Sequence, residues 1–176
     1  MIAAMESRMV RTLRWICLLA TAVPLAATAA HILELPNKLM LDGPLWLAVR
    51  QNIYRGWGPV IGPLEIVAAL ASWGLTYFTR GRQPTFALTL TAALCLSAMI
   101  AVFFLFNAPV NAAFAGWTAQ TLPADWPDYR RQWELGHAIA FGLALIAFCT
   151  LMRATFVEAC AQRGTVERPS PSVDRR

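Results

Sequence analysis

Residues 107–137 read NAPVNAAFAGWTAQTLPADWPDYRRQWELGH and lie between the third and fourth apolar segments of a very hydrophobic chain. The stretch contains one of the two histidines of the chain, two asparagines four residues apart, three tryptophans, two adjacent arginines and a Glu-x-x-His motif. A simple connector between membrane spans does not need so many polar groups beside the hydrocarbon, where ionisable groups are costly. We therefore interpret the rest of the chain as a membrane bundle that holds this stretch against a second polar cluster, at residues 31–38.

The composition is typical of an integral membrane protein. Of the 176 residues, 57% are apolar and 14% are charged, whereas soluble domains carry about 25% charged residues. The basic residues behind the net charge of +5 flank the apolar segments, so membrane topology explains them better than nucleic-acid binding does. Of the four cysteines, Cys17, Cys95 and Cys149 fall inside apolar segments, and the sequence has no Cys-x-x-Cys pair, which indicates inert thiols and not a disulfide framework.

The pattern of apolar segments predicts an all-α fold, a four-transmembrane-helix bundle that forms a single domain over residues 1–156. Each predicted span is long enough to cross ~30 Å of hydrocarbon at about 1.5 Å per residue. The spans are 12–35, 59–78, 84–106 and 132–156. A short interfacial helix is expected at 43–57, with an apolar stripe of Leu45, Val49 and Ile53 and with Arg50 elsewhere on the helix. The polar, proline-containing residues 157–176 are expected to be a disordered tail.

Two features of the first span remain open to interpretation. Pro36 is expected to end the helix, because proline lacks an amide donor and disfavours helical geometry at the preceding residue. An alternative for the N-terminal region is a cleaved signal peptide, since Arg8, Arg11 and Arg14 precede an apolar segment and the small residues 27–29.

Four spans bring the ends of spans one and three and the starts of spans two and four to one membrane face. The polar residues that can converge there are His31, Glu34, Glu65, Asn107, Asn111, Arg130, Glu134 and His137. Ten of the fifteen Lys and Arg residues fall on the opposite side, with the two termini and the turn at 79–83. The excess of positive charge predicts that both termini are cytoplasmic.

Three interpretations of this cluster are compatible with the residues. The first is a transition-metal site, because His-x-x-Glu and Glu-x-x-His pairs on facing helices resemble the ligand pattern of helical bundles; its ligands would be His31, Glu34, Glu65, Glu134 and His137. The second is a metal-free acid–base site, since histidine titrates near neutral pH and serves as a general base. The third is purely structural, with Glu34–Lys38 and Arg–Glu pairs joining the helices.

The pattern Asn107-x-Pro109-x-Asn111, then Trp126, then Arg130-Arg131-x-Trp133-Glu134-x-x-His137 resembles the anthrone oxygenase-like family of small four-helix membrane proteins, most of them domains of unknown function. The matching segment covers about a fifth of the chain and leads directly into the last span, as in the family. The resemblance implies a membrane oxygenase that converts an anthrone to an anthraquinone, in some members without an evident cofactor. It does not extend to the cluster at 31–38 or to Glu65.

From these observations we expect an oxygenase or oxidoreductase that acts on a lipophilic aromatic or quinone-like substrate. His137 or His31 would abstract a proton, and Glu134 and Glu34 would orient the imidazoles. Asn107, Asn111 and Arg130 would stabilise the resulting oxyanion, and Trp126, Trp133 and Glu65 would contact the substrate. The alternative is a non-enzymatic membrane protein, either a partner subunit or a binder of a small ligand or metal.

Overall fold

The computed structural model describes residues 2–166, and it describes side chains for residues 8–161. This part of the chain contains helices and no strand, which confirms the all-α prediction. The elements in order are α1 (Ile2–Leu39), α2 (Gly43–Asn52), α3 (Trp57–Thr79), α4 (Thr85–Val102), a π-helical turn η1 (Phe103–Asn107), α5 (Ala108–Phe114) and α6 (Trp126–Val166).

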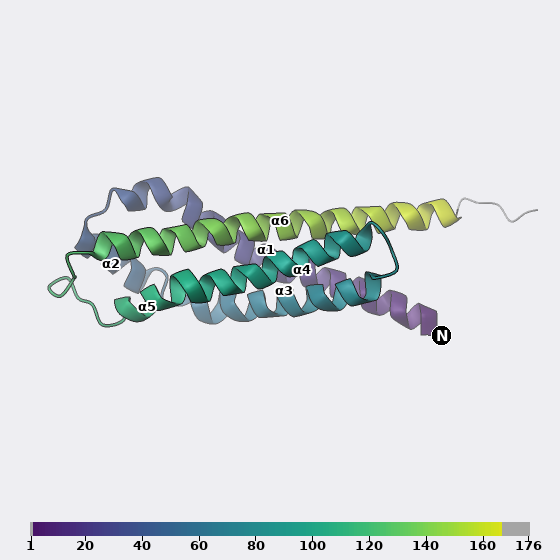
Figure 1. The fold of residues 1–176 in the computed structure, drawn as a ribbon, viewed down its shortest axis with the longest axis horizontal. Helices are drawn as coiled ribbons and strands as arrows, with labels where there is room; N and C mark the ends of the chain where they lie inside the picture. The colour runs from purple at the N-terminus through teal and green to yellow at the C-terminus, as the bar shows by residue number, and fades with distance from the viewer. Residues whose placement is uncertain (1, 167–176) are drawn as a thin grey trace, which may run out of the picture.

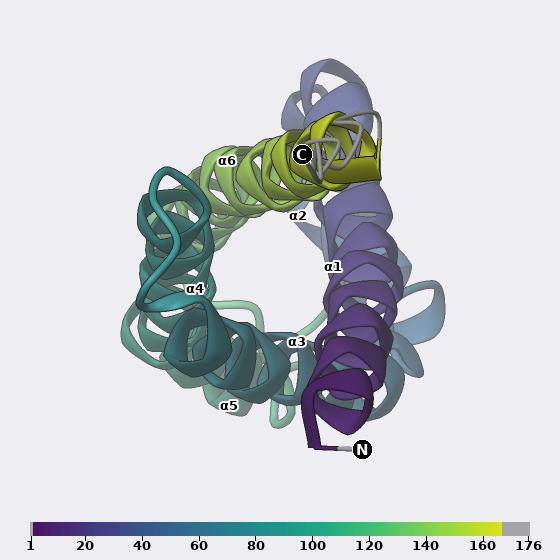
Figure 2. The same ribbon diagram turned by 90° about the vertical axis from the view of Figure 1, so that its right-hand side faces the viewer.

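Four long helices form the bundle, and each packs mainly against two neighbours, in the order α1, α3, α4, α6 and back to α1. Figure 2, viewed along the bundle, shows these four helices as a ring. The N-terminus, the turn between α3 and α4 and the end of α6 lie at one end, whereas α2, α5 and the start of α6 lie at the other (Figure 1). The predicted sidedness of the connections is therefore confirmed.

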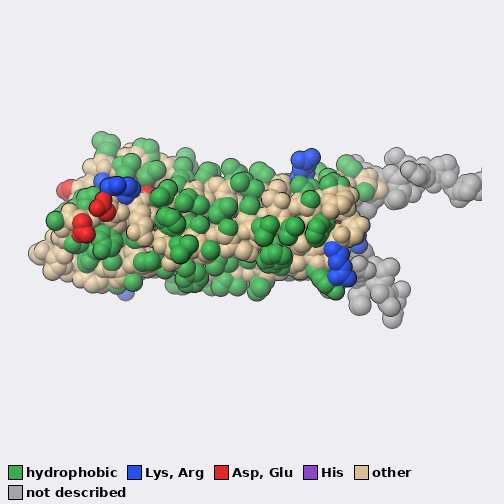
Figure 3. Space-filling model, in the orientation of Figure 1, with side chains coloured by type: hydrophobic (Ala, Val, Ile, Leu, Met, Phe, Trp, Pro, Cys, Tyr) green, Lys and Arg blue, Asp and Glu red, His purple; other side chains and the backbone are tan. Residues whose placement is uncertain are grey.

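The four helices are long and apolar enough to cross a membrane, over Arg8–Leu39, Trp57–Thr79, Thr85–Phe114 and Trp126–Ala161. Small residues fill the centre of the bundle, where Ala68, Ala92, Ala144 and Ala147 are fully buried. Small residues let membrane helices approach closely. Large apolar side chains such as Leu19 face outward, and Figure 3 shows them along the middle of the molecule with charged residues toward the two ends. The chain is therefore a multi-pass membrane protein.

The sequence predicted that the first helix ends at Pro36, but the helix continues to Leu39. Two contacts from α6 hold the turn that follows the proline. Lys38 forms an ion pair with Glu134, and the guanidinium of Arg130 donates to the carbonyls of Lys38, Leu39 and Leu41. The last carbonyls of a helix have no intrahelical partner, and Arg130 supplies donors to carbonyls at the end of α1.

The predicted interfacial helix is present, but it ends at Asn52 and is partly buried. Asp42 caps its N-terminus by accepting a hydrogen bond from the Leu45 amide at 2.9 Å. The buried side chains are Trp46 and Leu47, which pack with Tyr54, Val110, Phe114 and Trp133. Leu45 and Ile53 of the predicted apolar stripe are exposed. Helix α2 therefore packs one face against the bundle and leaves a second apolar face uncovered.

The third span continues through η1 and α5 to Phe114, as a longer, kinked helix in place of the predicted end at residue 106. The last helix continues to Val166, so the prediction of disorder is wrong for residues 157–166. In this region Glu158 of α6 forms an ion pair with Arg14 of α1, which gives the helix a tertiary contact beyond the predicted end of the span. Residues 167–176 of the predicted tail lie outside the described residues.

Candidate functional site

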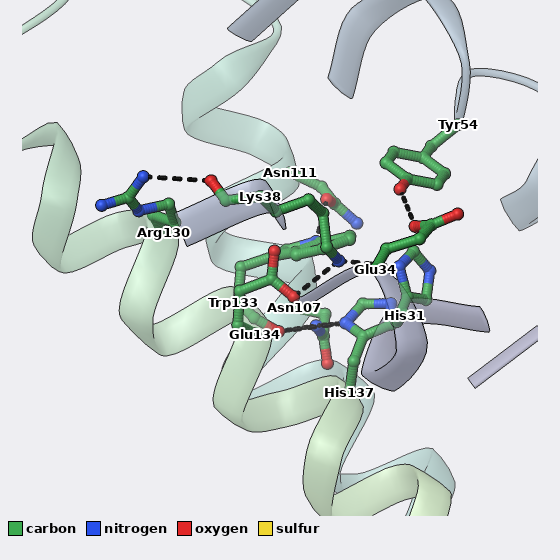
Figure 4. Close-up of polar contacts among 10 residues, drawn as sticks. All are labelled: His31, Glu34, Lys38, Tyr54, Asn107, Asn111, Arg130, Trp133, Glu134 and His137. Carbon is green, nitrogen blue, oxygen red and sulfur yellow. Dashed lines mark hydrogen bonds and ion pairs between the residues drawn. The ribbon is translucent and has the colours of Figure 1, made fainter. Parts of the chain in front are cut away.

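The two histidines of the chain meet inside the end of the bundle that carries α2 and α5. His31 of α1 and His137 of α6 have ring centroids 4.1 Å apart, at an interplanar angle of 72°. The indole of Trp133, one turn before His137, lies 3.9 Å from the His137 ring and 4.9 Å from the His31 ring. Figure 4 shows the side chains from α1 and α6 converging here. The predicted convergence from topology is thus present for both imidazoles.

Asn107 holds His137 from the neighbouring helix. Its Nδ2 donates to the carbonyl of Trp133 at 3.0 Å and lies 2.6 Å from Nδ1 of His137. This close approach depends on Gly136, because a Cβ there would overlap Oδ1 of Asn107 and would lie 2.8 Å from Cβ of Phe106. Asn107 ends the π-helical turn η1, a type of distortion that is frequent at functional sites.

Lys38 and Glu134 form a buried ion pair beside the histidines. Their Nζ and Oε2 atoms are 2.8 Å apart, and the two side chains are only 4% and 6% exposed. Nζ of Lys38 also lies 3.4 Å from Nδ1 of His31. The sequence suggested Glu34 as the partner of Lys38 and assigned Glu134 to orient an imidazole. In the structure Glu134 pairs with Lys38, and it is the ammonium of Lys38 that faces His31.

Glu34 accepts a hydrogen bond from the hydroxyl of Tyr54, which lies in the connection between α2 and α3 (Figure 4). Burial and this hydrogen bond raise the pKa of the Tyr54 phenol well above its usual range. Tyr54 therefore stays protonated at neutral pH and acts as a hydrogen-bond donor to Glu34. Its ring lies 4.8 Å from the His31 ring, so it forms one wall of the site.

Arg50 enters the site from α2, a position that sequence reasoning missed. The centre of its guanidinium is 3.5 Å from the centroid of the Trp133 ring, a distance typical of a cation–π contact. Its Nη2 donates to Oδ1 of Asn111 at 2.9 Å, and Nε1 of Trp133 donates to the same oxygen at 3.1 Å. The amide NH2 of Asn111 is left as a donor. Burial lowers the pKa of Arg50 to about 10, so the guanidinium is still charged at pH 7.

These side chains surround an inner cavity of about 150 Å³. Its wall includes both imidazoles together with Arg50, Tyr54, Trp57, Glu65, Asn111 and Trp133. Glu65 lines the cavity from α3, as expected from its place near the start of the second span.

The inner cavity adjoins two larger pockets. A polar outer pocket of about 720 Å³ shares Arg50, Tyr54, Gly58 and Asn111 with it. An apolar groove of about 440 Å³ between α1 and α3 shares Ala27, Trp57 and Ile61 with it. A ligand can therefore reach the inner cavity either through the polar outer pocket or through the apolar groove.

Three of the predicted substrate-binding residues are not on the wall of this cavity. Asn107 contacts His137 instead, and the other two are Arg130 and Trp126. Arg130 donates to backbone carbonyls at the end of α1, and its guanidinium is 4.6 Å from the centroid of the Trp126 ring. Trp126 packs in turn on Trp46, with ring centroids 5.5 Å apart. Both residues thus join α6 to α1 and α2, and the guanidinium on the cavity wall is that of Arg50.

The described residues contain no group of three or more His, Cys, Asp or Glu side chains that could hold one metal ion. The ammonium of Lys38 lies between Glu134 and His31, in the position that a shared cation would take. Glu34 is bonded to Tyr54. The five residues considered as metal ligands, His31, Glu34, Glu65, Glu134 and His137, are therefore near one another without forming a common ligand set.

The arrangement combines groups that can perform proton transfer with groups that bind a flat ring. The imidazoles can accept or donate a proton, and the Asn111 amide and Arg50 can stabilise negative charge on oxygen. The rings of Trp57, Tyr54 and Trp133 provide apolar walls. Such a cavity fits an aromatic molecule that passes through an oxyanion.

A model of the family described as anthrone oxygenase matches residues 51–150, which is more than half of the chain. The matched region contains α3, α4, η1, α5 and most of α6, and with them Asn107, Trp133 and His137. His31, Lys38 and Arg50 precede it. No curated protein and no solved structure matches the chain.

Proposed function

The chain belongs to the anthrone oxygenase family, and from that premise we propose that it is a membrane oxygenase that acts on a lipophilic aromatic or quinone-like substrate. The observation that carries the proposal is the contact between His31 and His137 in a cavity walled by aromatic rings. Buried, paired ionisable groups in membrane helices are generally functional.

The proposed reaction begins with removal of a proton from a ring-activated methylene carbon. His137 is the base in the tautomer whose Nδ1 donates to the Trp133 carbonyl, because this tautomer leaves the lone pair of Nε2 for the substrate. The electron pair moves to the conjugated carbonyl oxygen of the substrate. The Asn111 amide and the His31 imidazole can donate hydrogen bonds to this oxygen. Lys38 and Asn107 take the orienting role that the sequence assigned to the two glutamates.

Molecular oxygen then serves as the oxidant. The substrate carbanion gives up electrons to O2 and forms a carbon–oxygen bond, and a second proton is lost as the O–O bond breaks. One oxygen atom remains as a new carbonyl and the other leaves as water, so the substrate loses two hydrogens and gains one oxygen. Anthrone is converted to anthraquinone by this stoichiometry.

The surroundings of the cavity support a substrate that dissolves in the bilayer. The apolar groove between α1 and α3 reaches the inner cavity at Trp57, whose ring is 5.5 Å from that of His31. The proposal places this site at the non-cytoplasmic face, because the basic residues concentrate at the end with the termini. Reporter fusions at residues 40 and 120 should both be non-cytoplasmic.

The experiment is oxygen uptake with anthrone by protein in lipid nanodiscs. His137→Ala should abolish uptake, whereas Cys149→Ala, an exposed position further along α6, should retain it. Both variants should elute as folded protein in size-exclusion chromatography. Uptake by a folded His137→Ala protein equal to that of the parent would refute the assignment of the base. Absence of uptake by the parent would favour a ligand-binding membrane protein.

A further inference from the structure

Arg50 is a half-buried cation without an acidic partner among the described residues. No described carboxylate lies within ion-pair distance of its guanidinium, and its buried Nε has no hydrogen-bond acceptor. Its contacts are the Asn111 oxygen and the faces of aromatic rings. A buried charge is normally paired, because its removal from water is otherwise expensive.

Two of the carboxylates near Arg50 are bonded to other groups, and a third, Glu65, lines the same cavity from α3 without forming an ion pair with Arg50. Glu134, whose negative charge acts on Arg50, is the ion-pair partner of Lys38. Glu34 accepts a hydrogen bond from the hydroxyl of Tyr54. The protein itself thus supplies an amide and ring faces to this guanidinium, and leaves hydrogen-bonding capacity unused at Nε.

The guanidinium also lies where a ligand would meet it. Arg50 lines both the inner cavity and the polar outer pocket. The inner cavity, at about 150 Å³, has room for one aromatic ring, since a protein cavity of roughly that volume binds benzene. The adjoining apolar groove of about 440 Å³ has room for further fused rings. A ring in the inner cavity can present a substituent to Arg50, because Arg50 is part of the same wall.

We propose that the site binds its ligand as an organic anion, an aromatic acid whose carboxylate or ionised phenol oxygen accepts hydrogen bonds from Arg50. The aromatic ring occupies the inner cavity beside Trp133 and His137. This inference rests on the proposed function, because it names the substrate class of the same site. Arginine suits this role, since its planar donors bind carboxylates and other anionic oxygens in fixed geometry.

The test compares a charged ligand with its neutral isostere, 2-naphthoate and 2-naphthamide, in phosphatidylcholine nanodiscs at pH 7. Binding is measured by calorimetry and by quenching of tryptophan fluorescence. The parent protein should bind 2-naphthoate at least about tenfold more tightly, which corresponds to one charge-assisted hydrogen bond. Arg50→Gln should bring the two affinities within about twofold.

Arg55→Gln is the matched control, because Arg55 lines the outer pocket and not the inner cavity. This variant should keep the preference for the anion. Arg50→Lys, which keeps the charge, should retain part of it and serves if Arg50→Gln does not fold.

Three results would overturn the inference. They are equal affinities in the parent, an unchanged preference in folded Arg50→Gln, and an equal loss of preference in Arg55→Gln. The assay does not depend on turnover. An anion preference without oxygen uptake would therefore reject the proposed reaction alone, and oxygen uptake without an anion preference would reject this inference alone.

Discussion

The buried pair of Lys38 and Glu134 should be the polar contact whose loss destabilises the bundle most. In Lys38→Met the aliphatic stem is kept while the ammonium is removed. Oε1 of Glu134 already lacks a hydrogen-bond partner and Oε2 would lose its partner at 2.8 Å. Breaking a buried ion pair from one side costs about 3–5 kcal/mol. Because Glu134 can take up a proton, we expect the lower end, a loss of about 3 kcal/mol in the free energy of unfolding.

The assay is equilibrium unfolding in mixed micelles of increasing SDS content, followed by circular dichroism. The double variant Lys38→Met/Glu134→Leu should recover most of the lost stability, since replacing both partners with apolar groups is often neutral. Arg131→Met is the control, because the Arg131–Asp128 pair is 78% and 69% exposed and should contribute less than about 1 kcal/mol. A Lys38→Met protein as stable as Arg131→Met, or a double variant no more stable than Lys38→Met, would refute this account.

Two further predictions concern the packing of α6. Gly136→Ala should lower the free energy of unfolding by about 1–3 kcal/mol, because its Cβ would overlap Asn107. Gly142→Ala is the control and should not lower it, because no atom lies within 4 Å of the added Cβ. The same SDS titration compares the two variants. Glu158→Leu should cost about 1–3 kcal/mol, because it removes the carboxylate partner of the largely buried Arg14, and a thermal midpoint equal to that of the parent would contradict this.

The topology of the site could be predicted from the sequence because four spans constrain which helix ends share a face. That constraint alone brings His31 and His137 together, and it also places Glu65 near them. The sequence does not predict which side chains bond to one another, because more than one carboxylate can reach Lys38. Packing between α1 and α6 selects Glu134, whose position depends on the register of two helices.

Arg50 was missed for a different reason. The stripe of Leu45 and Ile53 suggested a helix lying on the membrane surface with its basic residues in water. In the structure the buried face of α2 carries Trp46, Leu47 and the partly buried Arg50. An amphipathic pattern indicates that a helix has two faces, and it does not indicate which neighbour covers the second one. The end of α1 was also mispredicted, because the contacts that hold the turn after Pro36 come from Arg130 of α6, far away in the sequence.

The wide turn at Phe103–Asn107 makes the geometry of the site depend on how this segment winds. A π-helical turn behaves as a single-residue insertion in an α-helix. If the same residues wound as a regular α-helix, everything beyond the turn would rotate by about 100°, the rotation of one residue. Asn111 would then point away from Arg50 and Trp133 even though every amino acid in α5 was unchanged. The winding of this turn, and not the composition of α5 alone, therefore decides which amide faces the ligand site.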